Sequence, residues 1–490
     1  MEQPSRRRYA SSVLWKLLER FSFAIVQLVI QILLARMLSP DDFGMLAIML
    51  AFTSVGMVIV QSGLNTALVQ RPDVGKRDYS TVFWMSLGIS VLLFAALFAG
   101  APVIADGFNL PGMVLPFRVM SFMLVVSAVG SVGTACMTRE MRFRSVFATS
   151  CVASLLSGGA GVLCAMFGAG IWALVVQQLG FQVVLAVALM LALRWHPAFV
   201  FDSSRASSLF SYGWKILASG LLDTAYQGLF DLVVGKRFDS TSLGMVSQGK
   251  RWPQAAGYLL DGAVQSVSLS ALSKVQDDAV RFKSMVKKTL VTYTYVMFLV
   301  SALFVACAES GVALILGEKW LPCVPFLQLY SLVYAFMAMQ TTNLQAMNAL
   351  GRSDLSLKLG LVKVVYGIVL VLFAACVIGD VLWVVGFYVI ASAISVFVNA
   401  YPNGSLIGYG VAEQLRDIGP AFVLAAACGA VSWFLGFLGL GYLATLCLQV
   451  FVVVGSYVGV SRLLGVRGFS YALEALSSLR ERNEGAGDSR

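Results

Sequence analysis

The sequence is poor in charged residues and in histidine. Charged side chains make up 12% of the 490 residues and hydrophobic side chains 59%, whereas roughly 25% charged residues are usual in soluble domains. The single histidine, His196, lies in a polar stretch between two apolar segments, which is typical of a surface residue. This composition excludes an ordinary soluble globular protein, and one imidazole offers little for histidine-based catalysis.

Motifs for nucleotide or metal chemistry are also missing. The eight cysteines lie in or beside apolar segments without paired spacing, so the sequence predicts neither a disulfide framework nor a zinc site. No G-x-x-x-x-G-K-[ST] loop occurs, which argues against ATP hydrolysis by this chain. We therefore expect no resident cofactor.

Long apolar stretches dominate the sequence instead. About fourteen of them approach the roughly 20 residues that an α-helix needs to cross the hydrocarbon core of a bilayer. The predicted fold class is an all-α polytopic membrane protein with about 14 transmembrane helices. No small-residue cleavage site follows the first stretch, so we expect it to remain as the first span. The stretches begin near Val13, Phe43, Ser80, Met113, Phe147, Ile171, Leu209, Leu243, Thr289, Val324, Leu357, Val381, Asp417 and Gly441.

The net charge of +10 indicates membrane topology and not nucleic-acid binding. Clusters of Lys and Arg at 6–8, 71–77, 139–144 and 274–288 all fall on the same side when the intervening spans are counted. The positive-inside rule assigns that side to the cytoplasm. Both termini are therefore predicted to be cytoplasmic, and no nucleic-acid partner is expected.

A polar corner occurs twice, 200 residues apart: LLARMLSPDDFGML from Leu33 and VVGKRFDSTSLGMV from Val233. Ser39 and Asp239 are residue types that cap helix N-termini, and Pro40 suits a first helical position. Hydrophobic staple positions surround each cap, namely Leu38 with Phe43 and Phe238 with Leu243. The repetition indicates a duplicated helical hairpin.

The duplication predicts two lobes. Six spans, an even number, separate the copies, so the repeats run in the same direction about an axis along the membrane normal, and the binding site is expected between the lobes. The predicted domains are an N-lobe of six spans (1–196), a cytoplasmic linker (197–207), a C-lobe of six spans (208–402), a terminal pair of spans (403–466) and a cytoplasmic tail (467–490).

Polar and charged residues recur inside three of the predicted spans. A charge at the centre of a bilayer costs roughly 2.5 to 3.5 kcal/mol on insertion scales, so these residues are expected to face protein or water. In the seventh span they recur at every fourth position and share one helix face. The seventh span carries Lys215, Ser219, Asp223, Gln227 and Asp231, the first Lys16, Glu19, Arg20, Gln27 and Gln31, and the eighth Lys250, Arg251 and Asp261.

Two interpretations of these residues stay open. In the first, the charges pair internally, as Asp223 with Lys215, and hold the lobes together. In the second, they line a water-filled cavity between the lobes. The whole set favours the cavity, because packing needs fewer ionisable groups than these helices carry.

The corner LLARMLSPDDFGMLAI, its counterpart VGKRFDSTSLGMVSQGKRW and the later stretch REMRFRSVF resemble oligosaccharide-lipid flippases of the Wzx type. These belong to the multidrug/oligosaccharidyl-lipid/polysaccharide exporter superfamily. The resemblance implies two six-helix lobes with a terminal helix pair, a cationic central cavity, and a location in the bacterial cytoplasmic (inner) membrane. It also implies alternating access that moves an undecaprenyl-diphosphate-linked repeat unit to the outer leaflet, for the synthesis of O-antigen, capsule or exopolysaccharide.

The resemblance also implies site residues and partners. Lys250 and Arg251 match the basic position that contacts the anionic substrate in related flippases, and Arg251 offers a bidentate fork to the diphosphate. The predicted partners are the lipid-linked oligosaccharide, the bilayer, a polysaccharide polymerase and a chain-length regulator. The predicted substrate-binding residues are Arg20, Lys215, Lys250, Arg251, Gln27 and Gln227, and the candidates for coupling to Na⁺ or H⁺ are Glu19, Asp223, Asp231 and Asp261.

Two other functions remain as alternatives at this point. A cation-coupled multidrug exporter shares the architecture, and the acidic residues Asp223, Asp231 and Asp261 suit it. A polytopic glycan polymerase or ligase is the weaker alternative, because the large outward loop of such enzymes is missing. As a flippase or as a multidrug exporter, the chain is expected to be a transporter and not an enzyme.

Overall fold

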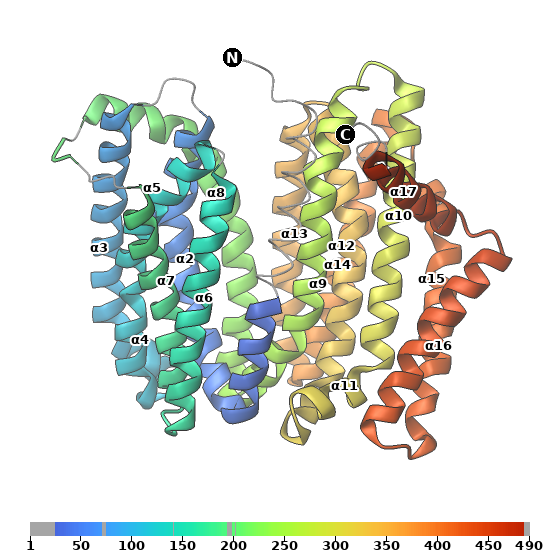
Figure 1. The fold of residues 1–490 in the computed structure, drawn as a ribbon, viewed down its shortest axis with the longest axis horizontal. Coiled ribbons are helices and arrows are strands. Elements are labelled where there is room, and N and C mark those ends of the chain that lie inside the picture. The colour runs from blue at the N-terminus through green and yellow to red at the C-terminus, as the bar shows by residue number, and fades with distance from the viewer. Residues whose placement is uncertain (1–24, 71–74, 141, 194–197, 201, 485–490) are drawn as a thin grey trace. The chain divides into compact units, whose positions relative to one another are not determined.

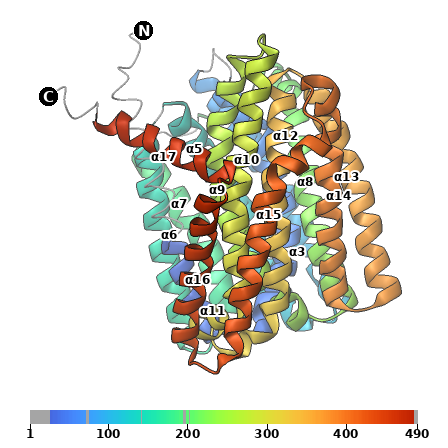
Figure 2. The same cartoon turned by 90° about the vertical axis from the view of Figure 1, so that its right-hand side faces the viewer.

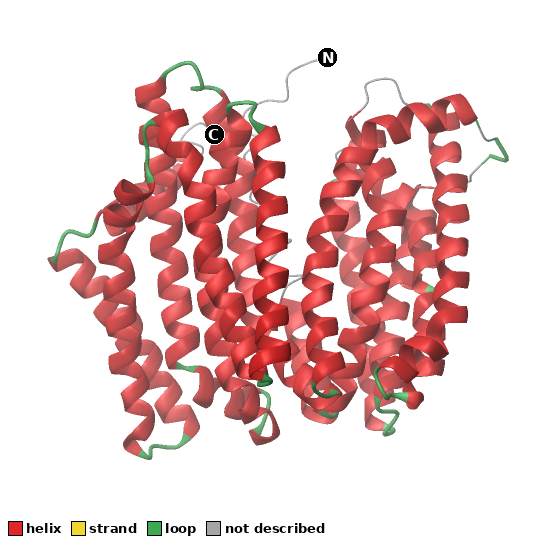
Figure 3. Ribbon diagram, turned by 180° about the vertical axis from the view of Figure 1, so that it is seen from behind, coloured by secondary structure: helices red, strands yellow, loops and turns green. Residues whose placement is uncertain are grey.

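The computed structural model describes residues 25–70, 75–140, 142–193, 198–200 and 202–484 (Figure 1). These residues form helices and connecting loops without a strand (Figure 3). Helices are expected, because a backbone that crosses hydrocarbon must satisfy its N–H and C=O groups internally. The all-α polytopic fold class is therefore confirmed.

The described chain forms two compact units, Met1–Gly244 and Met245–Arg490. A short apolar helix, Ile25–Met37, is the first described element of the first unit. The other helices of this unit are α2 (Pro40–Gln70), α3 (Lys76–Gly107), η1 (Pro111–Met113), α4 (Val114–Ser121), α5 (Met123–Arg139), α6 (Phe143–Met166), α7 (Ile171–Leu193) and α8 (Ser203–Arg237).

The helix α9 (Ser240–Ser273) begins at the end of the first unit and continues into the second. The second unit ends with a terminal pair of helices and one further helix. Its elements are α10 (Ala279–Ala306), α11 (Ala308–Ile315), η2 (Glu318–Cys323), α12 (Val324–Ala349), α13 (Ser353–Phe373), η3 (Ala374–Ile378), α14 (Val381–Ile407), α15 (Val411–Phe434), η4 (Leu435–Leu438), α16 (Tyr442–Leu463) and α17 (Arg467–Glu484).

Eleven helical segments of the described chain are long and apolar enough to cross a membrane. The helices α8 and α9, of 35 and 34 residues, are long enough as well, but both carry ionisable residues in mid-helix and fall outside that set. The order of segments agrees with the predicted spans. The count of 14 stays a prediction, because the first predicted span lies largely in residues 1–24, outside the described residues.

The compact units divide the chain at a different place from the predicted lobes. α8, which was assigned to the C-lobe, packs along α2 and belongs to the first unit. The predicted linker 197–207 is only partly a loop, because α8 begins at Ser203. The lobes themselves are defined by the sequence repeat and stay a prediction.

The predicted tail begins with a helix, α17, which runs from Arg467 to Glu484. α17 runs across α10 in the second unit (Figure 2). Phe469 lies against the ring of Tyr295, with 6.5 Å between the ring centroids, and Lys288 pairs with Glu474 at 2.6 Å. These contacts fold the start of the tail onto the helical bundle.

Topology can be tested with reporter fusions placed near the ends of the helical spans. Reporter fusions after Phe108, Gly379 and Phe437 are expected to report the outer side, and fusions after Lys76 and Lys287 the cytoplasm, because of the Lys and Arg distribution. Alkaline phosphatase and green fluorescent protein activities would measure the two sides. A fusion after Lys287 that reports the outer side would contradict the topology.

Candidate functional site: polar helices and a repeated corner

The two repeated corners cap their helices as their residue types predict. Before α2, the N–H and hydroxyl of Ser39 donate to Asp42 Oδ2 at 3.0 and 2.6 Å, and the Asp42 N–H donates to Ser39 Oγ at 3.2 Å. Before α9, the Ser242 N–H donates to Asp239 Oδ1 at 2.6 Å. Each cap satisfies backbone donors that the first helical turn leaves unpaired. The predicted caps at Ser39 and Asp239 are confirmed.

The two corners also meet each other. A Cβ atom added to Gly44 would overlap the backbone of Ser240, and one added to Gly244 would overlap the backbone of Pro40. Because residue 40 corresponds to residue 240 in the repeat, the two contacts are reciprocal, as at an interface with two-fold symmetry. The Ser240 hydroxyl also hydrogen-bonds Asp41. The two repeated corners therefore form a crossing, in which the N-termini of α2 and α9 pack against each other at Gly44 and Gly244.

The predicted stripe of the seventh span lies on α8 in the first unit. Asp223 is exposed, and Gln227 and Asp231 are half-buried. Each of the three interacts with a further group, so both interpretations of the stripe stay open. Lys215 lies in α8, but its side chain is outside the described residues.

The predicted basic pair lies on α9 in the second unit. Lys250 and Arg251 are half-buried, and both have interactions with other groups. They lie ten and eleven residues after Ser240, or roughly 15 Å along the helix at 1.5 Å per residue. This depth places two cations well inside a helix long enough to cross a membrane.

Asp261, the acidic residue predicted in the eighth span, lies on α9 away from Arg251. Ten residues of the same helix, roughly 15 Å, separate them. Asp261 is 6% exposed and accepts hydrogen bonds from Gln265 Nε2 at 2.5 Å and the Tyr293 hydroxyl at 3.2 Å. These bonds tie α9 to α10.

The predicted residues of the first span are described only in part. Glu19 and Arg20 lie outside the described residues. Gln27 lies in the helix Ile25–Met37 and is half-buried. The predicted set is therefore divided between the two units, and only its members on α8 and α9 are described in any detail.

A buried amide cluster in the second unit was missed by the sequence reasoning. Asn343 donates to Gln414 Oε1 at 2.9 Å, and Asn403 donates to Asn343 Oδ1 at 2.6 Å. All three side chains are buried. They join α12, α14 and α15. Asn343 and Asn403 occur inside apolar spans, and this signal in the sequence would have found them.

A second missed cluster is ionic and centres on Asp417 of α15, whose side chain is 5% exposed. It pairs with Lys287 at 2.7 Å and Arg467 at 3.3 Å and accepts a hydrogen bond from the Tyr409 hydroxyl at 2.9 Å. Burial, and then the Asp417 carboxylate, raise the pKa of Tyr409, so the hydroxyl remains a donor. The cluster holds the start of α17 against α15 and α10.

Asp417→Asn is expected to lower the free energy of unfolding by on the order of 3 kcal/mol, because it leaves two cations without their shared carboxylate. Glu474→Gln is the matched control. It removes an exposed partner of Lys288 and is expected to cost less than about 1 kcal/mol. Thermal unfolding of the purified protein in detergent measures both. Equal losses would contradict a special role for Asp417.

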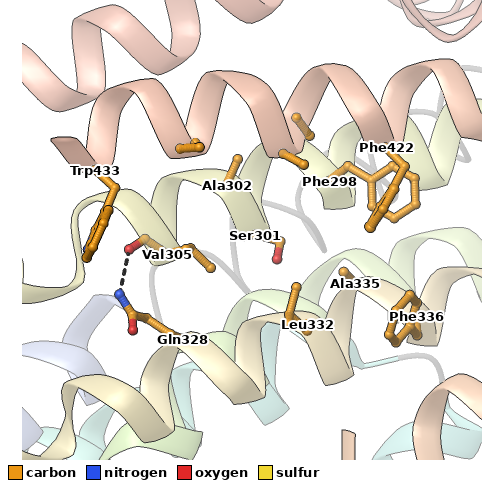
Figure 4. Close-up of a pocket in the computed structure, with 14 residues that line it drawn as sticks. Phe298, Ser301, Ala302, Val305, Gln328, Leu332, Ala335, Phe336, Phe422 and Trp433 are labelled. Carbon is orange, nitrogen blue, oxygen red and sulfur yellow. Dashed lines mark hydrogen bonds between the residues drawn. The ribbon is translucent and has the colours of Figure 1, made fainter. Parts of the chain in front are cut away.

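An apolar pocket of about 390 Å³ lies in the second unit between α10, α12 and α15 (Figure 4). Aromatic side chains line it at both ends, including Phe336, Phe422 and Trp433. The amide of Gln328 donates to the carbonyl of Val305 at 3.1 Å. The pocket is lined without a charged side chain, so it suits an apolar ligand and not a diphosphate.

No group of three or more His, Cys, Asp or Glu that could hold a metal ion occurs among the residues that the structure describes. The carboxylates predicted to bind a coupling ion, Asp223, Asp231 and Asp261, lie on α8 and α9. Their role in ion coupling stays a prediction.

Comparisons with known proteins agree with this architecture. A model of the family described as polysaccharide biosynthesis protein matches residues 33–325. The teichuronic acid biosynthesis protein TuaB of Bacillus subtilis (strain 168) is 25% identical over 87% of this chain and 89% of its own length. The lipopolysaccharide biosynthesis protein WzxC of Escherichia coli (strain K12) is 22% identical over 90% of each chain. A solved structure of the lipid II flippase MurJ, in an inward closed conformation, covers 92% of this chain and 99% of its own with a TM-score of 0.73 and 14% identity, which shows a shared fold.

Proposed function

The chain belongs to the polysaccharide biosynthesis protein family, and from this premise we propose that it is a flippase for lipid-linked oligosaccharides. Its substrate is an undecaprenyl-diphosphate-linked repeat unit, which it moves by alternating access from the cytoplasmic to the outer leaflet of the inner membrane. A transporter needs no catalytic residue for this step. The polymerase and chain-length regulator of the same surface polysaccharide are the partners that would use the product.

The observation that carries the proposal is the basic pair on α9. Lys250 and Arg251 lie about 15 Å inside a helix long enough to span a bilayer. A diphosphate cannot cross a medium of low dielectric constant without compensating charge. Arg251 can form two parallel hydrogen bonds to phosphate oxygens, and Lys250 supplies a second cation. Arg20, Lys215, Gln27 and Gln227 are the further substrate contacts in this proposal.

The crossing of the two corners supplies the outer seal. It lies at helix ends that the charge distribution assigns to the outer side. Gly44 and Gly244 allow the two backbones to touch, and opening toward the outside requires this contact to part. Glycine at both positions therefore permits a closed state that a larger residue would prevent.

The source of energy is an ion gradient or the consumption of the flipped product outside. Asp223 and Asp231 are the first candidates for binding Na⁺ or H⁺, because intramembrane carboxylates commonly serve such roles. Asp261 is a third candidate. A multidrug exporter would also use such carboxylates, but the family match to polysaccharide biosynthesis proteins favours the oligosaccharide-lipid substrate.

Purified protein in liposomes is expected to flip an undecaprenyl-diphosphate oligosaccharide without ATP. Accessibility of the sugar to a membrane-impermeant lectin or glycosidase measures the movement, and protein-free liposomes are the control. An imposed Na⁺ or pH gradient is expected to raise the rate if the carboxylates couple transport. A strict need for ATP, with no other protein present, would contradict the proposal.

A further inference from the structure

A second apolar pocket, of about 350 Å³, lies in the first unit between α2, α3 and α8. Its wall is aliphatic apart from Phe52 and is built without a charged or hydrogen-bonding side chain. A dry cavity of about 150 Å³ holds a benzene molecule. Benzene has six carbon atoms, so the pocket has room for roughly a dozen.

The pocket and the polar stripe lie on opposite faces of α8. At about 100° per residue, Ala225, Leu229 and Leu232 form one face of this helix. These residues line the pocket. Around the helix axis, Asp223 and Gln227 lie about 160° from the centre of this face and Asp231 about 120° from it. The same turns of α8 therefore carry polar residues on one face and border the apolar pocket on the other.

The pocket lies on the side of α8 that faces α3, where the helices pack less closely. α8 packs closely along α2 and only lightly on α3. A Cβ atom added to Gly228 would lie 3.4 Å from the Ala51 carbonyl oxygen, which is ordinary contact between α8 and α2. The α3 side of the pocket is formed by Leu93 and Leu97, both in the middle of the span Arg77–Gly107.

We propose that this pocket holds a segment of the polyprenyl tail of the substrate while Gln227, on the opposite face of α8, contacts the sugars of the headgroup. The inference rests on the proposed function. A lipid-linked oligosaccharide has a polar head joined to a long apolar chain, and the chain must remain in an apolar environment while the head crosses. A helix with a polar face and a tail pocket at the same depth binds both parts of one such molecule. A phospholipid of the surrounding bilayer could fill the pocket, but it would not contact the polar face of α8 at the same time.

Photocrosslinking tests the occupant. Benzoylphenylalanine at position 97 is expected to form an adduct with a polyprenyl chain, identified by mass spectrometry, in cells that make the repeat unit. Val103 on the same helix is 75% exposed and is the matched control, expected to give phospholipid adducts. At least tenfold enrichment of the polyprenyl adduct at position 97 supports the proposal. Phospholipid adducts at position 97, independent of repeat-unit synthesis, overturn it.

Filling the pocket gives a second test. Leu97→Trp is expected to reduce at least fivefold the preference for a full-length tail over a three-isoprene analogue in the liposome assay, with Val103→Trp unchanged. An unchanged preference in a Leu97→Trp protein that flips substrate removes only this inference. Wild-type protein that flips neither lipid overturns the proposed function itself.

Discussion

Arg251→Ala is expected to lower flipping in liposomes roughly 10- to 100-fold while leaving the amount of protein in the membrane unchanged. A hydrogen bond to a charged group is worth about 1.5 to 3 kcal/mol, and 1.4 kcal/mol is a factor of ten. Arg251→Lys is expected to recover only part of the rate, because the bidentate fork is lost and a point charge remains. The liposome assay and an immunoblot of membranes measure the two quantities.

The matched control is Lys274→Ala, which removes one positive charge from an exposed position just after α9. Its flipping rate is expected to match the wild type. A purely structural Arg251 would instead give low protein abundance in Arg251→Ala. Asp261→Asn is not expected to restore that abundance, because roughly 15 Å of helix separates residues 251 and 261. Normal flipping by a well-expressed Arg251→Ala protein would exclude the proposed role.

Gly44→Ala and Gly244→Ala are each expected to lower flipping roughly 5- to 140-fold. The added methyl group would overlap the backbone of Ser240 or of Pro40, and overpacking of this kind typically costs 1 to 3 kcal/mol. The overlap destabilises the state in which the two corners touch. The variants are therefore expected to close the outer seal less often than the wild type. Cysteine crosslinking between positions 41 and 240 in membranes measures how often the corners meet.

Gly88→Ala on α3 is the control for the crossing, because a Cβ atom there meets nothing within 4 Å. It is expected to leave both flipping and crosslinking unchanged. The double variant of Gly44 and Gly244 is expected to lose crosslinking almost completely. If either single variant flips substrate at the wild-type rate, the crossing is not a seal that the transport cycle requires.

Much of the fold could be predicted from local features of the sequence. Apolar length predicts each span, because a helix in hydrocarbon needs about 20 residues and satisfies its own backbone. The caps at Ser39 and Asp239 were likewise predictable, because a cap joins residues only three positions apart. The helix at the start of the tail could not be predicted in this way, because it packs on α10 through Phe469 and Glu474.

The candidate site could be predicted less completely. The sequence identified Asp223, Asp231, Lys250 and Arg251 as charges in predicted spans, but not their neighbours. Asp261 was a candidate for ion coupling, and only the fold shows its contact with Tyr293 of α10. The amide cluster around Asn343 and the ionic cluster around Asp417 each join helices that lie far apart in the sequence. Pairing of this kind cannot be inferred from spacing along one helix.

Composition and span length were enough to identify a helical membrane protein, because bilayer insertion acts on each segment separately, and the resemblance of the corner motifs indicated its family. The contact between Gly44 and Gly244, the burial of Asp417 and the pocket behind the polar face of α8 depended on the tertiary structure. Each of these depends on contacts between segments that lie far apart in the sequence, and only the packing of the helices determines which segments meet. The repeat indicated that two corners exist, and only the fold placed one against the other.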